Sequence, residues 1–179
     1  MGEEQKKALE QQLWNIANEL RGKMDADEFR DYILGFIFYK YLSEKIEDFA
    51  NELLEEDGIK YTTIDELTEN GKELLDGIKE DCIEQLGYFL KPNELFKAMA
   101  VKGNLANDNF ILEDLTQVLR HIEQSTMGHE SEDDFEHLFE DLDLTSTKLG
   151  KTEEQKNTLI SKILAHLNKI DFQLKNHDR

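Results

Sequence analysis

An apolar and strongly aromatic run near the N-terminus, Tyr32 to Tyr39 in the stretch DYILGFIFYKYLSEK, most constrains how this chain can fold. The chain is otherwise acidic, with 40 Asp and Glu residues against 21 Lys and Arg residues and a formal net charge of -19. The run is closed by Asp31 and Lys40, so it is too short to cross a bilayer, which takes about 20 apolar residues. We therefore expect other parts of the chain to cover it.

The flanking sequence indicates that this run belongs to a long helix rather than to a buried strand. Asp25 or Asp27 can cap the N-terminus of a helix, and apolar residues continue at helical spacing beyond the run. We predict one central helix from about residue 25 to residue 55, apolar on every side in its first half and on one face in its second half. Phe36 and Ile37 are predicted to be core residues.

Composition extends the helical prediction to the whole chain. The 179 residues contain one proline and many Leu, Glu, Lys and Gln residues, which are good helix formers. We predict an all-α fold with little or no β structure: one domain, residues 1–179, folded as a compact irregular bundle of about seven to nine helices around the central aromatic helix. A single cysteine, Cys82, and the lack of an apolar signal segment at the N-terminus favour a cytoplasmic protein with no membrane partner.

Further helices are predicted from apolar spacing and from capping residues. Amphipathic helices are expected at about 3–21, 72–86 and 109–125, and a short acidic helix is expected after Ser131. In the segment LGYFLKPNELF, glycine can end one helix and proline can begin the next, with an extended stretch between them.

Two pairs of residues are typical of capping boxes, in which each side chain bonds the backbone N–H of the other residue. Thr152 with Gln155 predicts the start of a last helix, whose apolar stripe continues almost to the C-terminus. Thr63 with Glu66 predicts a short helix that ends near Gly71.

The sequence contains no recognisable catalytic or metal-binding motif. It lacks a G-x-G-x-x-G stretch, a P-loop and an H-E-x-x-H pair. The segment from Asp141 resembles part of a calcium loop, but Ser146 and Thr152 stand where Gly and a bidentate Glu are required. Three histidines that recur eight residues apart are also not expected to bind a metal, because the helix that carries the first is interrupted before the second. They are His121, His129 and His137.

Four stretches of the sequence together resemble one protein family. They are LWNIANELRGKMDADEFRDYILGFIFYKYLSEK (13–45), LGYFLKPNELF (86–96), FEHLFEDLDLTSTKLG (135–150) and ILAHLNKIDF (163–172). In order and spacing they are similar to the N-terminal helical domain of the modification (M) subunit of type I restriction-modification systems. The first stretch is the most specific, because helical periodicity alone would not select its Phe-Tyr-Lys-Tyr-Leu step.

The resemblance implies a parent subunit that methylates adenine N6 in double-stranded DNA with S-adenosylmethionine. It also implies a complex with a specificity subunit, a second M subunit and a restriction subunit. In this family a Rossmann-like catalytic domain follows the helical domain, here after residue 179, and carries a glycine-containing cofactor motif and an Asn-Pro-Pro-Phe motif for the flipped adenine. Neither motif occurs in this chain, so the resemblance assigns it no catalytic, cofactor-binding or metal-binding residue.

Charge indicates which part of such a domain can approach DNA. Residues 125–145 contain eight acidic residues and no Lys or Arg, whereas residues 146–179 contain seven Lys or Arg residues and four acidic ones. Lys148, Lys151 and Lys156 are therefore candidate DNA-proximal residues, near a helix N-terminus that adds partial positive charge. The alternative is that these lysines only keep a loop of an acidic domain soluble.

Two other functions are compatible with the acidic composition. An acidic DNA mimic would present carboxylates at phosphate-like spacing to a DNA-handling protein, although the net positive C-terminal part disfavours this function. A helical adaptor for protein interactions, with no catalytic link, is the other. Binding to free duplex and binding to a purified methyltransferase distinguish these functions.

Overall fold

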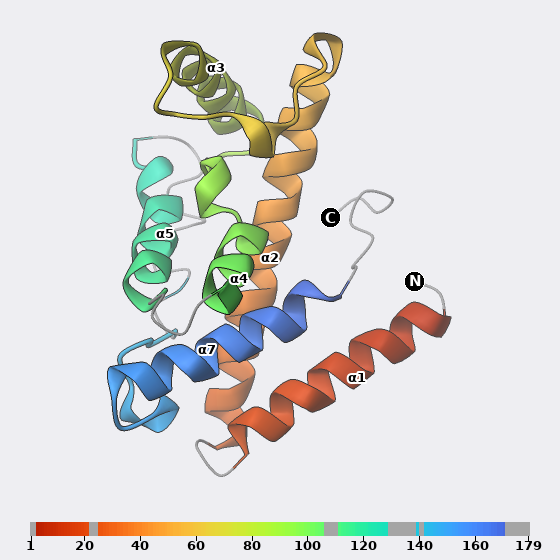
Figure 1. Ribbon diagram of the computed structural model, residues 1–179, viewed down its shortest axis with the longest axis vertical. Coiled ribbons are helices and arrows are strands. Elements are labelled where there is room, and N and C mark those ends of the chain that lie inside the picture. The colour runs from red at the N-terminus through yellow and green to blue at the C-terminus, as the bar shows by residue number, and fades with distance from the viewer. Residues whose placement is uncertain (1–2, 22–24, 106–110, 129–138, 140–141, 171–179) are drawn as a thin grey trace.

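The computed structural model describes residues 3–21, 25–105, 111–128, 139 and 142–170, and Figure 1 shows their arrangement. Within these ranges the chain forms six α-helices and four 3-10 turns and no strand, which confirms the predicted all-α fold class. No helix in the described part is long and apolar enough to span a membrane. In chain order the elements are α1 (Glu3–Leu20), α2 (Ala26–Leu54), η1 (Glu55–Asp57), η2 (Tyr61–Thr63), α3 (Glu69–Gln85), η3 (Pro92–Glu94), α4 (Phe96–Leu105), α5 (Leu112–Ser125), η4 (Thr147–Leu149) and α7 (Glu153–Asn168).

Helix α2 is the long axis of the fold, and its bounds agree with the predicted central helix (Figure 1). Phe36 is fully buried as predicted, while Ile37 is only partly buried. The sequence predicts that the first half of α2 is apolar on every side, as in a helix surrounded by others, but Leu34 in this half is 55% exposed, so the surrounding elements do not cover it completely. The buried side chains of α2 recur at helical spacing: Tyr32, Ile33, Phe36, Tyr39, Leu42, Ile46, Ala50 and Leu54.

The residues from Tyr88 to Phe96, here called the 88–96 segment, join α3 to α4 along an extended path with one 3-10 turn, as the sequence predicts. Irregular backbone that is buried must find hydrogen-bond partners outside regular structure. Three buried tyrosine hydroxyls supply such bonds to carbonyl groups and tie the segment to α2 and η2. The pairs are Tyr39 to Glu94, Tyr61 to Leu90 and Tyr88 to Leu42.

Burial raises the pKa of Tyr39, Tyr61 and Tyr88 well above the ordinary tyrosine value, so these phenols keep their protons and remain hydrogen-bond donors even at alkaline pH. A backbone donor of the same region is also satisfied by a side chain, since the N–H of Phe96 donates to Ser43 Oγ at 2.9 Å. The 88–96 segment is therefore bonded to α2 both through groups that donate and through a carbonyl that accepts.

The start of α3 differs from the sequence prediction. Thr63 belongs to η2, and the N-cap is Thr68, whose Oγ1 accepts from the N–H of Gly71 at 2.9 Å. The short helix predicted to end near Gly71 is not formed, and α3 begins at Glu69 instead. A turn precedes α3, in which the N–H and the hydroxyl of Thr68 donate to the Asp65 carbonyl, and Gly71 packs against that carbonyl, where a Cβ would come within 1.8 Å of the oxygen.

Helix α7 lies between α4 and α1 (Figure 1). The Gln12 Oε1 atom of α1 lies 3.2 Å from His166 Nδ1 of α7. On the outer side of α1, Trp14 is 57% exposed and the Arg21 guanidinium lies 5.7 Å from its ring centroid. The apolar stripe predicted for the last helix is confirmed in the described residues, where Ile160, Ile163, Leu164, Leu167 and Ile170 are buried.

Helix α5 confirms the amphipathic helix predicted at about 109–125, although residues 109 and 110 lie outside the described ranges. The acidic helix predicted after Ser131 also falls outside them. The apolar face of α5 is buried through Leu112, Leu115, Val118, Leu119 and Ile122.

Candidate functional site

The loop of residues 142–152, here called the lysine loop, carries two of the three predicted DNA-proximal lysines. It folds into short turns ahead of α7. Asp143 Oδ1 accepts from the N–H of Thr145 at 2.9 Å and from its hydroxyl at 2.6 Å. Ser146 Oγ then accepts from the N–H of Lys148 at 3.2 Å at the start of η4. Such bonds from Asp and Ser to the following backbone define tight turns, so the loop has a specific local conformation.

The interior side of the lysine loop is apolar, and the charge of Asp143 is stabilised by hydrogen bonds within the loop. Leu142, Leu144 and Leu149 are buried. The hydrogen bonds from the hydroxyl and the N–H of Thr145 lower the pKa of the Asp143 carboxyl. The loop is therefore anchored by leucines and internally bonded rather than extended into solvent.

The structure separates the three predicted lysines. Lys148 and Lys151 are exposed on the lysine loop, whereas Lys156, in the first turns of α7, is only 7% exposed. Lys156 Nζ donates to the carbonyl oxygen of Thr145 at 2.8 Å and lies 3.3 Å from Glu153 Oε1. Because this ammonium is directed into the fold, we retain only Lys148 and Lys151 as candidates for direct contact with DNA.

The start of α7 shows most of the predicted capping box. Thr152 Oγ1 accepts from the N–H of Gln155 at 3.1 Å, as predicted. Gln155 Oε1 accepts from the N–H of Lys151 at 2.8 Å, one residue before the expected partner. Glu153 and Glu154 occupy the first turn and offset the partial positive charge of the helix end. Positive charge in the loop therefore comes from its exposed lysines more than from the helix.

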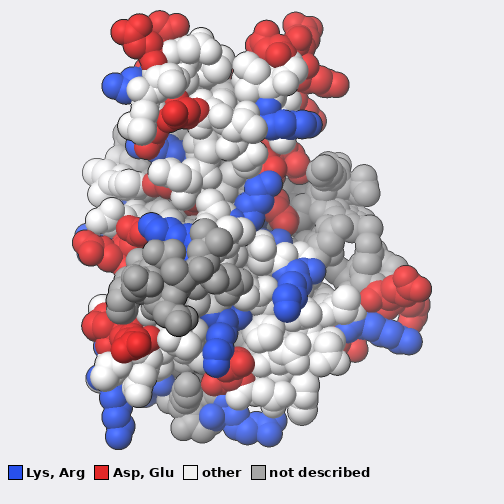
Figure 2. Space-filling view, in the orientation of Figure 1, with Lys and Arg blue, Asp and Glu red and all other residues white. Residues whose placement is uncertain are grey.

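Charge is also divided across the molecular surface. Figure 2 shows Asp and Glu side chains gathered at the end formed by α3 and the C-terminal end of α2. Lys and Arg side chains project at the opposite end, where Figure 1 places the lysine loop, the start of α7 and the turn between α1 and α2, with some Asp and Glu side chains among them. An anionic partner meets less repulsion at that end of the molecule.

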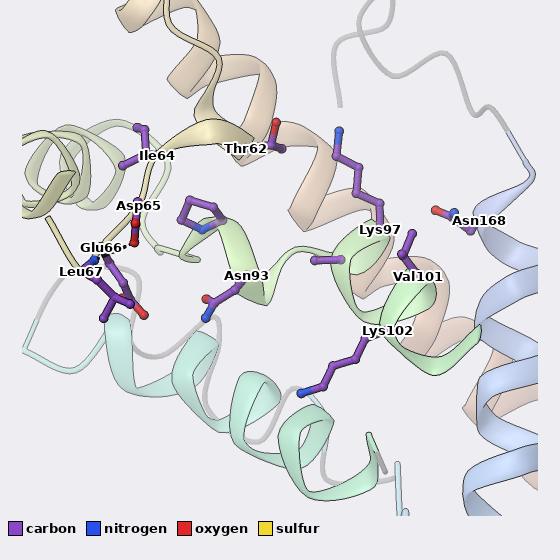
Figure 3. A pocket seen from close by; sticks show the side chains of 12 residues that line it. Thr62, Ile64, Asp65, Glu66, Leu67, Asn93, Lys97, Val101, Lys102 and Asn168 are labelled. Atoms are coloured by element: carbon purple, nitrogen blue, oxygen red, sulfur yellow. Dashed lines mark hydrogen bonds between the residues drawn. The ribbon is translucent and has the colours of Figure 1, made fainter. Parts of the chain in front are cut away.

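A cleft that sequence periodicity did not single out lies between the 62–67 segment, η3 and α4 (Figure 3). Its volume is about 860 Å³, and Leu67 at its edge is 87% exposed. Two lining lysines are engaged by carboxylates, Lys97 with Glu47 at 2.7 Å and Lys102 with Asp114. The described lining contains no Ser, Cys or His, the residue types that most often provide a nucleophile and its base. The cleft thus resembles a surface groove more than a catalytic pocket.

The remaining titratable candidates are accounted for by structural contacts. His121 Nδ1 pairs with the nearly buried carboxylate of Glu94. Cys82 is buried, and burial raises the pKa of its thiol to about 12. Within the described ranges no group of three His, Cys, Asp or Glu residues could hold a metal ion. Three residues of the sequence motifs that are not expected to bind a metal, His129, His137 and Asp141, lie outside those ranges.

Comparison with known proteins agrees with the sequence resemblance. The pattern of the HsdM N-terminal domain matches residues 9–167. The methylase subunit of the type I restriction enzyme MpnII from Mycoplasma pneumoniae is 32% identical over 175 residues, which cover 94% of this chain and 31% of that protein. A crystal structure of the methyltransferase subunit of a type I restriction-modification system from Streptococcus thermophilus matches with a TM-score of 0.71 and 35% identity, over 92% of this chain and 34% of that chain.

The fold is thus that of a helical domain found in the methyltransferase subunits of type I restriction-modification systems. This chain belongs to the HsdM N-terminal domain family. It spans about a third of the length of the two relatives.

Proposed function

We propose that this chain is the N-terminal domain of a modification subunit that methylates adenine N6 in double-stranded DNA with S-adenosylmethionine. The family match over residues 9–167 is the observation that carries this proposal. The sequence of the chain contains one proline and therefore no Asn-Pro-Pro-Phe motif, so the chemistry belongs to a catalytic domain that follows residue 179 in the complete subunit.

Within the complex, the domain helps to close the enzyme around the duplex in the cytoplasm. Its other surfaces contact the specificity subunit or the neighbouring M subunit, and the restriction subunit joins the same assembly. The lysine loop is the part of the domain that faces DNA, with Lys148 and Lys151 near the phosphates. Their exposure, and the gathering of acidic side chains at the other end of the molecule, support this orientation.

The test uses the complete complex of M and specificity subunits, because the net charge of -19 disfavours DNA binding by the isolated domain. Lys148→Glu and Lys151→Glu are introduced together, and DNA affinity is measured over a range of salt concentrations. We expect weaker binding and a dependence of log affinity on log salt that is flatter by about one to two units, as for the loss of about two phosphate contacts.

A matched control changes two exposed lysines of α3, Lys72→Glu and Lys79→Glu, which lie at the acidic end of the molecule. This control carries the same change in net charge and should leave the salt slope unchanged. Equal losses in both double variants would indicate a general effect of charge. If the Lys148 and Lys151 variant keeps the DNA affinity and the salt slope of the parent complex, the lysine loop is not on the DNA side.

A further inference from the structure

The buried ammonium of Lys156 is the feature of the lysine loop that the proposed DNA contact does not use. A charged group removed from water is costly unless it is paired and hydrogen-bonded. Lys156 Nζ meets this requirement with the Thr145 carbonyl, 11 residues earlier in the chain, and with Glu153 Oε1. Lys156 therefore connects the first turns of α7 to the middle of the lysine loop.

A second connection holds the loop from the side of α2. The hydroxyl of Tyr32, whose ring is nearly buried, donates to the carbonyl of Asp143 across 111 residues of sequence. Next to this bond, Gly35 allows a close approach of the loop, since a Cβ at that position would lie 2.6 Å from Leu142 Cδ1. The beginning of the loop is thus fixed to the central helix.

The end of the loop lies directly on α7. A Cβ at Gly150 would lie 2.7 Å from the Cβ of Gln155 and 2.9 Å from the backbone nitrogen of Lys156. Together with the Tyr32 and Lys156 bonds, this contact fixes the backbone on both sides of Lys148, and the bond from the N–H of Lys151 to Gln155 Oε1 holds the backbone at Lys151. Their backbone positions are set before any ligand arrives, which lowers the entropy cost of binding.

We propose that Lys156 and Tyr32 are positioning residues, which hold the lysine loop in the conformation that presents Lys148 and Lys151 to DNA together. This inference rests on the proposed function of the loop. It assigns Lys156 an indirect role, in which its ammonium orients the loop backbone and does not itself meet a phosphate.

The test is a double-mutant cycle in the complete complex of M and specificity subunits. Lys156→Met keeps the apolar stem and removes the ammonium. It is made in the parent and in a background with Lys148→Gln and Lys151→Gln. DNA affinity, its salt slope and S-adenosylmethionine affinity are measured for each. We expect Lys156→Met to weaken DNA binding of the parent by about three- to tenfold, with unchanged S-adenosylmethionine affinity, and to cause no further loss in the background without the two exposed lysines.

Two further variants keep the test decisive. Tyr32→Phe removes only a hydroxyl and should show the same pattern of DNA binding in both backgrounds. It therefore tests the inference even if Lys156→Met does not fold. Ile163→Val, a buried change in α7 away from the loop, should lower thermal stability and leave DNA affinity unchanged.

The outcomes separate this inference from the function on which it rests. A loss from Lys156→Met and Tyr32→Phe that is equal in both backgrounds would overturn the positioning role, because it would not act through Lys148 and Lys151. No loss from either variant, while the exposed-lysine variant binds DNA weakly, would overturn the positioning role and leave the proposed function standing. No loss from the exposed-lysine variant itself would overturn both.

Discussion

The 88–96 segment and the lysine loop are both irregular and both held by side chains that donate to carbonyl groups, but their surroundings differ. In the 88–96 segment the tyrosine donors are almost completely inaccessible to solvent. In the lysine loop one phenol and one ammonium hold the backbone from the interior, while Lys148 and Lys151 remain exposed.

This difference separates a segment that stabilises the fold from one that can also bind a partner. A bond enclosed by the core contributes to stability and is not accessible to a ligand. A loop whose backbone is bonded to the interior and whose charged side chains are exposed presents those charges on a rigid support, which is the usual arrangement of a binding loop. The two regions should therefore respond differently to substitution.

The largest expected effect comes from the helix that supports both regions. Phe36 is fully buried in α2 between Tyr32, which holds the lysine loop, and Tyr39, which holds the 88–96 segment. Truncating a buried Phe to Ala typically costs about 3 to 5 kcal/mol. Phe36→Ala should therefore lower the melting temperature of the domain by about 10 °C, measured by calorimetry. A shift of a degree or less would show that this part of α2 is not core.

A smaller effect tests whether the lysine loop lies as tightly on α7 as the contact at Gly150 indicates. Gly150→Ala forces the loop and the helix apart, and such overpacking typically costs about 1 to 3 kcal/mol, measurable by chemical denaturation. Gly77→Ala is the control, because Gly77 lies within α3 and a Cβ at that position would have open space around it. That change should stabilise the domain by about 0.5 to 1 kcal/mol through helix propensity. Stabilisation by both changes would indicate a loosely packed loop.

The smallest effect concerns Asp143, whose pKa in the folded domain is lowered by the hydrogen bonds from Thr145. A lowered pKa means that the folded state favours the carboxylate. The stabilisation is therefore present above the ordinary Asp value of about 3.9 and is lost as the pH falls through the lower folded value. Thr145→Ala should move the pKa of Asp143 upward in an NMR titration. An unchanged pKa of Asp143 in this variant would show that the hydroxyl of Thr145 does not lower it.

Apolar periodicity was sufficient to predict α2, α5 and α7, because each of these helices buries one continuous face. It was not sufficient for the start of α3, since Thr63 and Thr68 are both able to cap a helix. In the structure Thr68 is the cap, at the end of a turn in which its N–H donates to the Asp65 carbonyl, and apolar spacing does not predict that turn.

The same limit applies to the candidate site. The exposed positions of Lys148 and Lys151 follow from a loop rich in small polar residues, which the sequence makes visible. The inward direction of the Lys156 side chain cannot be predicted in this way, because its hydrogen-bond partner is a carbonyl of an irregular turn. Helical spacing carries no information about where such a carbonyl lies.

Trp14 is the only tryptophan of the chain, and it lies at the solvent-exposed edge of α1 rather than in the aromatic core. Tryptophan fluorescence of the isolated domain, excited at wavelengths that the tyrosines do not absorb, therefore reports the environment of one peripheral helix, while circular dichroism reports all the helices. Transitions that coincide in the two signals indicate that α1 unfolds together with the core, and an earlier fluorescence transition indicates that α1 leaves α7 first. In an assembly, a blue shift of the same emission would report that a partner covers this edge of the domain.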